Sequence, residues 1–181
     1  MIFFIVIVIA SFLSLVAQEF LPPLAWLYGA RVVIVPTLMF YGAMALPYSG
    51  MLALAFISGL MVDALMVTQV VDSQVEISLG WSILLYAALG AIMSGFRPLF
   101  QRGRWEVHCL MSGLFTSLIL LAEYLMITVR RGGLVFPPEI WWRIGGSGVI
   151  AAMLAPIFFF TLNWLAPLVG YEINPEKKGI I

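Results

Sequence analysis

Residues 51–71 read MLALAFISGLMVDALMVTQVV, an apolar run in which Asp63 is the one charged residue. A run of this length can cross the hydrocarbon core of a membrane as a helix, which takes about 20 residues. An aspartate at the centre of such a helix costs roughly 2.5–3.5 kcal/mol in lipid, so its side chain normally faces a bundle interior, a partner or a cavity. Asp63 is therefore the first candidate for a functional residue.

The composition of the 181-residue chain indicates an integral membrane protein. Hydrophobic residues make up 63% of it and charged residues 10%, and the mean hydropathy is +1.09. The formal net charge is zero, so the sequence predicts neither a nucleic-acid partner nor a cationic one. One cysteine, Cys109, excludes an internal disulfide, and one histidine, His108, excludes the usual zinc sets. No metal or cofactor is predicted.

Proline, glycine and charged residues divide the chain into six predicted transmembrane helices, all in one domain that covers residues 1–181. Their expected ranges are roughly 2–19, 30–47, 50–71, 79–97, 106–129 and 143–168. The first range has no basic residue before it and no clear cleavage site after it, so a retained helix is expected rather than a signal peptide. The fold class is an all-α membrane bundle, in which a tight turn at Pro47 makes the second and third helices antiparallel neighbours.

The distribution of Lys and Arg predicts that both termini are cytoplasmic, because positively charged loops stay on that side of the membrane. The cytoplasmic side would then carry Arg97, Arg102, Arg104, Lys177 and Lys178, and the outer side Arg31, Arg130, Arg131 and Arg143. Two of the outer arginines, Arg31 and Arg143, fall at helix starts, where they can pair internally.

This orientation brings four charged residues to a similar depth in the outer half of the bundle. Asp63 would lie roughly 20 Å from the cytoplasmic start of its helix, and Glu123 roughly 25 Å along the fifth helix. Arg31 and Arg143 would open the second and sixth helices. Two interpretations stay open: a polar pocket or partner-binding patch that opens outward, or ion pairs that only hold the bundle together. Gly59, four residues before Asp63, has the spacing of close helix packing.

Enzymatic interpretations find no catalytic set in the sequence. The segment Gly145-Gly146-Ser147-Gly148 looks like the Gly-x-Ser-Gly of rhomboid intramembrane proteases, but their base is a histidine on a later helix and His108 is upstream. Asp72 lies in a predicted loop, without the sequence context of membrane aspartyl proteases. Packing of small residues at the start of the last helix explains the glycines better, so a non-enzymatic protein is expected.

The chain carries, in this order, Pro22-Pro23, Arg31, Ala45-Leu46-Pro47, Phe56-x-x-Gly59-x-x-x-Asp63, Gly80, Tyr86, Glu123, the connection from Val135 to Trp142, and the closing helix from Gly148 to Phe158. This ordered pattern resembles the MreD family, the rod-shape-determining membrane proteins of bacteria. The resemblance covers roughly residues 12–165 and departs from the family in an enlarged outer loop at 68–79, which carries Asp72 and Glu76.

The resemblance implies a non-enzymatic scaffold subunit of the cell-elongation (rod) complex in the bacterial inner membrane. Such a subunit would help set cell shape by binding MreC and, through it, would support MreB and the polymerase and transpeptidase pair of peptidoglycan synthesis. The resemblance also implies a fold similar to the substrate-binding subunits of energy-coupling-factor transporters. The alternative function is therefore a vitamin-binding transporter subunit, with its pocket at Asp63 and Glu123.

Overall fold

The computed structural model describes residues 1–68, 80–97, 105–130, 132–133 and 136–171. Within these ranges the chain forms six α-helices and one short 3-10 helix, η1 (Ala25–Leu27). The α-helices are α1 (Ile2–Phe20), α2 (Val35–Ala45), α3 (Tyr48–Thr68), α4 (Trp81–Gly95), α6 (Trp105–Arg130) and α7 (Pro138–Leu168). Four of them, α1, α3, α6 and α7, are long and apolar enough to cross a membrane, whereas α2 and α4 are shorter apolar helices.

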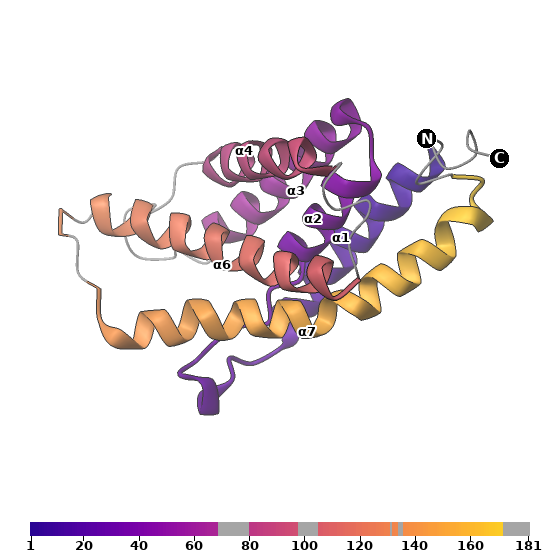
Figure 1. Ribbon diagram of the computed structural model, residues 1–181. Coiled ribbons are helices and arrows are strands. Elements are labelled where there is room, and N and C mark those ends of the chain that lie inside the picture. The colour runs from indigo at the N-terminus through magenta and orange to yellow at the C-terminus, as the bar shows by residue number, and fades with distance from the viewer. Residues whose placement is uncertain (69–79, 98–104, 131, 134–135, 172–181) are drawn as a thin grey trace.

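Helix α2 is the centre of the bundle. It contacts each of the other five α-helices, and every one of its residues except Met44 is buried. Figure 1 shows the longer helices arranged around it, with α6 and α7 running side by side. Large apolar side chains on α1, α6 and α7 stay exposed on the outside of the bundle, for example Phe12, Leu114 and Met153. An apolar exterior around an apolar core is what a bilayer requires.

The second predicted helix is wrong at its N-terminal end. The sequence predicts a helix from residue 30, but α2 begins at Val35, and residues 31–34 are not helical. The reason lies in the run Val32-Val33-Ile34: β-branched side chains lose rotamer freedom in a helix. Pro36 then suits the first helical turn, where a backbone N–H has no helical partner to lose.

Side chains from outside α2 satisfy the backbone at both ends of this helix. The N–H of Ile34, just before the helix, donates to Oε1 of Gln18 on α1 at 3.2 Å. At the other end, Arg97 donates to the carbonyls of Met44 and Leu46, and the Tyr171 hydroxyl donates to the carbonyl of Ala45 at 2.8 Å. A short helix buried on all sides needs these partners, because water does not reach its terminal polar groups.

Helix α7 is longer than predicted. It starts at Pro138 rather than at 143, with proline in its first turn and Glu139 close behind, which is a favourable helix start. The helix continues through Pro156 and changes direction part-way along (Figure 1). Just after its end, the ring of Tyr171 stacks on Phe3 of α1 with centroids 4.5 Å apart. The start of α1 and the end of α7 therefore lie at the same end of the bundle.

Candidate functional site

Asp63 caps the N-terminus of α4 from the neighbouring helix α3. Its carboxylate accepts hydrogen bonds from the backbone N–H groups of Gly80, at 2.6 Å, and Ser82, at 3.3 Å. The first N–H groups of a helix have no partner inside the helix, and the helix dipole favours an anion there. Only 2% of Asp63 is exposed. In this chain the aspartate therefore faces its own bundle.

Gly59 brings α4 close enough to α3 for this capping to occur. A Cβ atom at position 59 would lie 2.5 Å from Cα and 2.6 Å from the backbone nitrogen of Ile83 on α4, which is too close for any side chain. Asp63 follows one helical turn later on the same face of α3. Gly80, the N-cap residue of α4, has φ = 100°, a conformation that glycine adopts readily. Gly59, Asp63 and Gly80 thus fix α4 against α3; we call this arrangement the α3–α4 clamp.

The ion pairs that the sequence allows are not formed between these residues. All four candidate charges lie in the described part of the chain, and no hydrogen bond or ion pair joins Asp63 or Glu123 to Arg31 or Arg143. The partners of Asp63 are backbone N–H groups instead. Sequence reasoning missed this because the partners, 17 and 19 positions after Asp63, are backbone N–H groups, which every residue except proline has.

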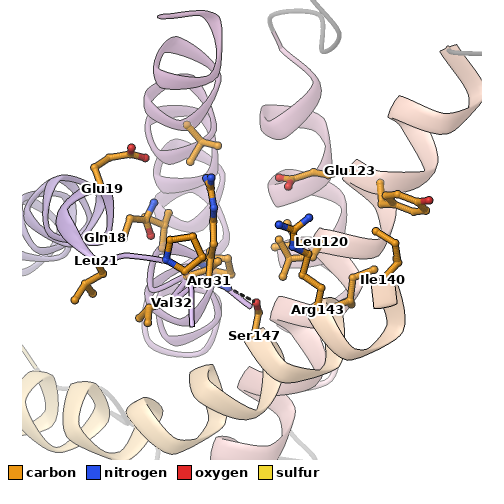
Figure 2. A pocket seen from close by; sticks show the side chains of 18 of the residues that line it. Gln18, Glu19, Leu21, Arg31, Val32, Leu120, Glu123, Ile140, Arg143 and Ser147 are labelled. Atoms are coloured by element: carbon orange, nitrogen blue, oxygen red, sulfur yellow. Dashed lines mark hydrogen bonds between the residues drawn. The ribbon is translucent and has the colours of Figure 1, made fainter. Parts of the chain in front are cut away.

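A pocket of about 770 Å³ opens at the end of the bundle where α1, α3 and α6 end and α2, α4 and α7 begin. Three of the four predicted charges, Arg31, Glu123 and Arg143, line it, whereas Asp63 does not and only its neighbour Val62 does. Figure 2 shows the side chains of Arg31, Arg143 and Glu123 directed toward the same space. They come from the non-helical segment before α2, from α7 and from α6.

The non-helical segment 31–34 forms one wall of this pocket, and side chains hold it in place. Besides the Gln18 contact, the N–H of Arg31 donates to the hydroxyl of buried Ser147 on α7 at 3.2 Å. Irregular backbone at membrane depth is tolerated where it lines a cavity or is buried in protein. Gln18 and Ser147 are therefore site residues that sequence analysis did not select. A polar Gln18 near the end of an apolar helix was the available signal.

Arg143 is positioned by the loop after η1. Its Nε donates to the carbonyl of Gly29 at 3.2 Å, and a Cβ at position 29 would lie 3.3 Å from the guanidinium. Gly29 also has φ = 77°, a left-handed conformation suited to glycine. The guanidinium group of Arg143 therefore packs against Gly29, which has no side chain.

Two of the three glycines around Ser147, Gly146 and Gly148, are packing residues, as the sequence interpretation had it, whereas a Cβ at Gly145 would meet nothing within 4 Å. A Cβ at Gly146 would press on Leu27, and one at Gly148 would lie 2.9 Å from the carbonyl oxygen of Gly113 on α6. Helices α6 and α7 therefore cross with their backbones in near contact, in the manner of small-residue crossings in membranes. The enlarged loop at 68–79 lies outside the described residues, apart from Thr68 at the end of α3.

The candidate site thus has two parts at one end of an all-helical bundle with four candidate membrane spans: the buried α3–α4 clamp and the open polar pocket. Val62 and Asp63, adjacent on α3, connect the two parts. Comparison of the chain with protein-family models, with curated proteins and with solved structures gives no match.

Proposed function

We propose that all six α-helices belong to a transmembrane bundle in the bacterial inner membrane, with both termini cytoplasmic. α2 alone is about 16 Å long, and the non-helical residues 31–34 before it lengthen this span toward the roughly 30 Å of the hydrocarbon core. The second span would then begin as non-helical backbone and continue as the helix α2. In this orientation the pocket opens toward the outside of the cell.

Within that membrane, we propose that the chain acts as a non-enzymatic subunit of the cell-elongation complex, similar to MreD. The observation that carries this proposal is the α3–α4 clamp, because Gly59, Asp63 and Gly80 are also residues on which the family resemblance rests. The clamp gives them a shared physical purpose, which is to hold two helices in a fixed arrangement. A fixed surface is what a scaffold needs in order to bind the same partner repeatedly.

The partner we propose is an MreC-like membrane protein, which docks its transmembrane helix and adjacent outer segment on the outer half of the bundle. Asp63 is buried, so it would act on this docking surface indirectly, by fixing the position of α4. Through the MreC-like protein the chain would support MreB and the peptidoglycan polymerase and transpeptidase pair. Lipid bilayer covers the remaining apolar exterior.

Three experiments test this function. Depletion of the chain should convert rod-shaped cells to round ones, and an MreC-like protein should co-purify with the chain.

Asp63→Asn should weaken retention of that partner while the bundle stays folded, with the exposed acid Glu139 changed to Gln as a matched control at the same end of the bundle. Rod-shaped growth without the chain would reject the family assignment. Full complex assembly by Asp63→Asn would reject the indirect role, and loss of the folded protein would make Asp63 a structural residue only.

The second candidate is a small-molecule binding subunit of an energy-coupling-factor type transporter. The pocket of about 770 Å³ favours it, since pockets of this size commonly hold small ligands. The two candidates differ in what accompanies the purified chain. A vitamin bound at one molecule per chain would favour the transporter subunit, and an MreC-like protein would favour the scaffold.

A further inference from the structure

The pocket combines charged side chains of both signs with apolar walls. Arg31, Arg143 and Glu19 are exposed at its opening, and Glu123 is half-buried in its wall. Between them the lining is largely aliphatic, with Val32, Val62, Ile119, Leu120, Ile140 and Ile144. A molecule that satisfies all of these surfaces has a polar head with an anionic group and an apolar remainder.

The two arginines are available to bind an anion. Among the described residues, the guanidinium of Arg31 has no recorded hydrogen bond or ion pair, and Arg143 has one bond, from Nε to the Gly29 carbonyl. Guanidinium groups present a planar set of donors that matches the oxygens of phosphate or carboxylate. Val35 and Pro36, in the first turn of α2, also line the pocket, so the positive end of that helix dipole faces the same space.

Glu123 supplies the complementary group deeper in the pocket. Its carboxyl group points into the space that Arg31 and Arg143 share (Figure 2), and the described residues give it no hydrogen-bond or ion-pair partner. A half-buried carboxyl group without a protein partner is costly unless a ligand or water satisfies it. A donor on the ligand, such as an amine or a hydroxyl, would do so.

Exposed aromatic residues mark the depth of the pocket opening. Trp26, Tyr28, Trp141 and Trp142 are all more than half exposed, and Tyr28 stacks on Trp142 with ring centroids 6.1 Å apart. These residues are close in sequence to Arg31 and Arg143. Tryptophan and tyrosine prefer the level of the lipid headgroups, because their rings are apolar and carry a polar tip. At that level the two arginines would meet lipid phosphates.

We infer that the pocket binds a phosphate-bearing amphiphile whose head also carries a hydrogen-bond donor. The phosphate lies between Arg31 and Arg143, the donor reaches Glu123, and the apolar part follows the aliphatic wall. A membrane phospholipid and a soluble phosphorylated molecule share this head chemistry, and the aromatic residues favour the lipid. The inference uses only the pocket and does not rest on membership of the rod complex.

Thermal unfolding of the full-length chain in detergent tests this site. We expect a short-chain phosphatidylethanolamine to raise the unfolding temperature in a saturable way, and a diacylglycerol with the same chains to have no such effect. Arg31→Gln and Arg143→Gln should each weaken the apparent affinity about tenfold, the loss expected for one charge-assisted contact. Arg130→Gln is the matched control, because Arg130 is exposed at the same end of the bundle but does not line the pocket.

Glycerophosphoethanolamine, which is phosphatidylethanolamine without its acyl chains, distinguishes a lipid ligand from a soluble one. Stabilisation by the phospholipid alone supports a lipid ligand, and stabilisation by both compounds supports a soluble one. Equal stabilisation by diacylglycerol, or unchanged affinity in both arginine variants, overturns the inference. If Arg143→Gln does not fold, Arg31→Gln decides, since the Arg31 side chain has no recorded partner among the described residues.

A comparison of two phospholipids tests the role of Glu123. Phosphatidylcholine has the same net charge as phosphatidylethanolamine but no N–H donor on its head. The native chain should therefore prefer phosphatidylethanolamine, and Glu123→Gln should reduce that preference while the bundle stays folded. A preference that is unchanged in Glu123→Gln, or one that is absent from the native chain, removes Glu123 from the binding site.

Discussion

The carboxylate of Asp63 on α3 accepts a hydrogen bond of 2.6 Å from the backbone N–H of Gly80, the N-cap residue of α4. Inside a membrane, a carboxylate without hydrogen-bond donors is costly, and so is a helix N-terminus without acceptors. Each group removes the cost of the other, because the carboxylate needs donors and the helix N-terminus needs acceptors. This reciprocity explains an acid inside an apolar run without a catalytic or ion-coupling role.

Replacement of Asp63 by Ala should destabilise the bundle by about 1–3 kcal/mol, because two buried N–H groups lose their acceptor. Asp63→Asn keeps one acceptor oxygen, without the negative charge, and should lose less. The measurement is equilibrium unfolding in mixed detergent micelles. Leu60→Ala, on an exposed position of α3, provides the control. Equal stability of Asp63→Ala and the control would show that the cap contributes nothing.

Gly59→Ala should destabilise the protein by about 1–3 kcal/mol, in the range of overpacked cores. The added methyl group would meet backbone atoms of Ile83, and backbone cannot move aside as the end of a flexible side chain can. Gly95→Ala is the matched control, since Gly95 lies on α4 with nothing within 4 Å of a Cβ there. In the control, the higher helix propensity of alanine should leave stability unchanged or raised. A stable Gly59→Ala variant would contradict the close approach of α3 and α4.

The sequence predicts α1 and α6 well, at 2–19 and 106–129 against the observed Ile2–Phe20 and Trp105–Arg130. These helices have long apolar runs with charge or proline at their ends, and hydrophobicity alone defines them. The late start of α2 required a different signal, the β-branched run before Pro36, which lies inside the apolar segment and leaves hydropathy unchanged. A buried apolar segment has high hydropathy whether its backbone is helical or extended, so hydropathy does not locate the start of α2.

The sequence predicts only part of the candidate site, for a related reason. Arg31, Glu123 and Arg143 stand out in an apolar sequence, and helix lengths alone place them near one end of the bundle. The partners of Asp63 could not be found in this way, because they are backbone N–H groups and every residue except proline has one. Ser147 and Gln18 accept hydrogen bonds from the backbone of segment 31–34, so their roles depend on the path of that segment. The path follows from the packing of α1 and α7 around it.

Tyr171→Phe should reduce stability by about 1 kcal/mol, because the Ala45 carbonyl at the end of α2 loses one donor while the stacking on Phe3 remains. Burial raises the pKa of the Tyr171 hydroxyl, against an opposite effect of Arg97, so the hydroxyl stays protonated and donates at neutral pH. A group whose pKa is raised on folding contributes its stability below its unfolded pKa and loses it as the pH rises through the folded value. Stability should therefore fall at strongly alkaline pH, and less steeply in Tyr171→Phe. Parallel alkaline unfolding curves for the two proteins would contradict this role.

The glycines that flank Ser147 give the sharpest comparison, because two of them lie one turn apart on the same helix in opposite surroundings. A Cβ at Gly148 would press on the backbone of Gly113 and on Ser117, whereas a Cβ at Gly145 would meet nothing within 4 Å. Gly148→Ala should therefore separate α6 from α7 and cost about 1–3 kcal/mol, and Gly145→Ala should be neutral or stabilising. Unfolding of the two variants under identical conditions measures the difference, and a crosslink between cysteines placed on α6 and α7 reports the separation directly. If the glycines served a serine nucleophile at position 147 instead, Gly145 and Gly148 would differ in activity rather than in stability, and the two unfolding curves would coincide.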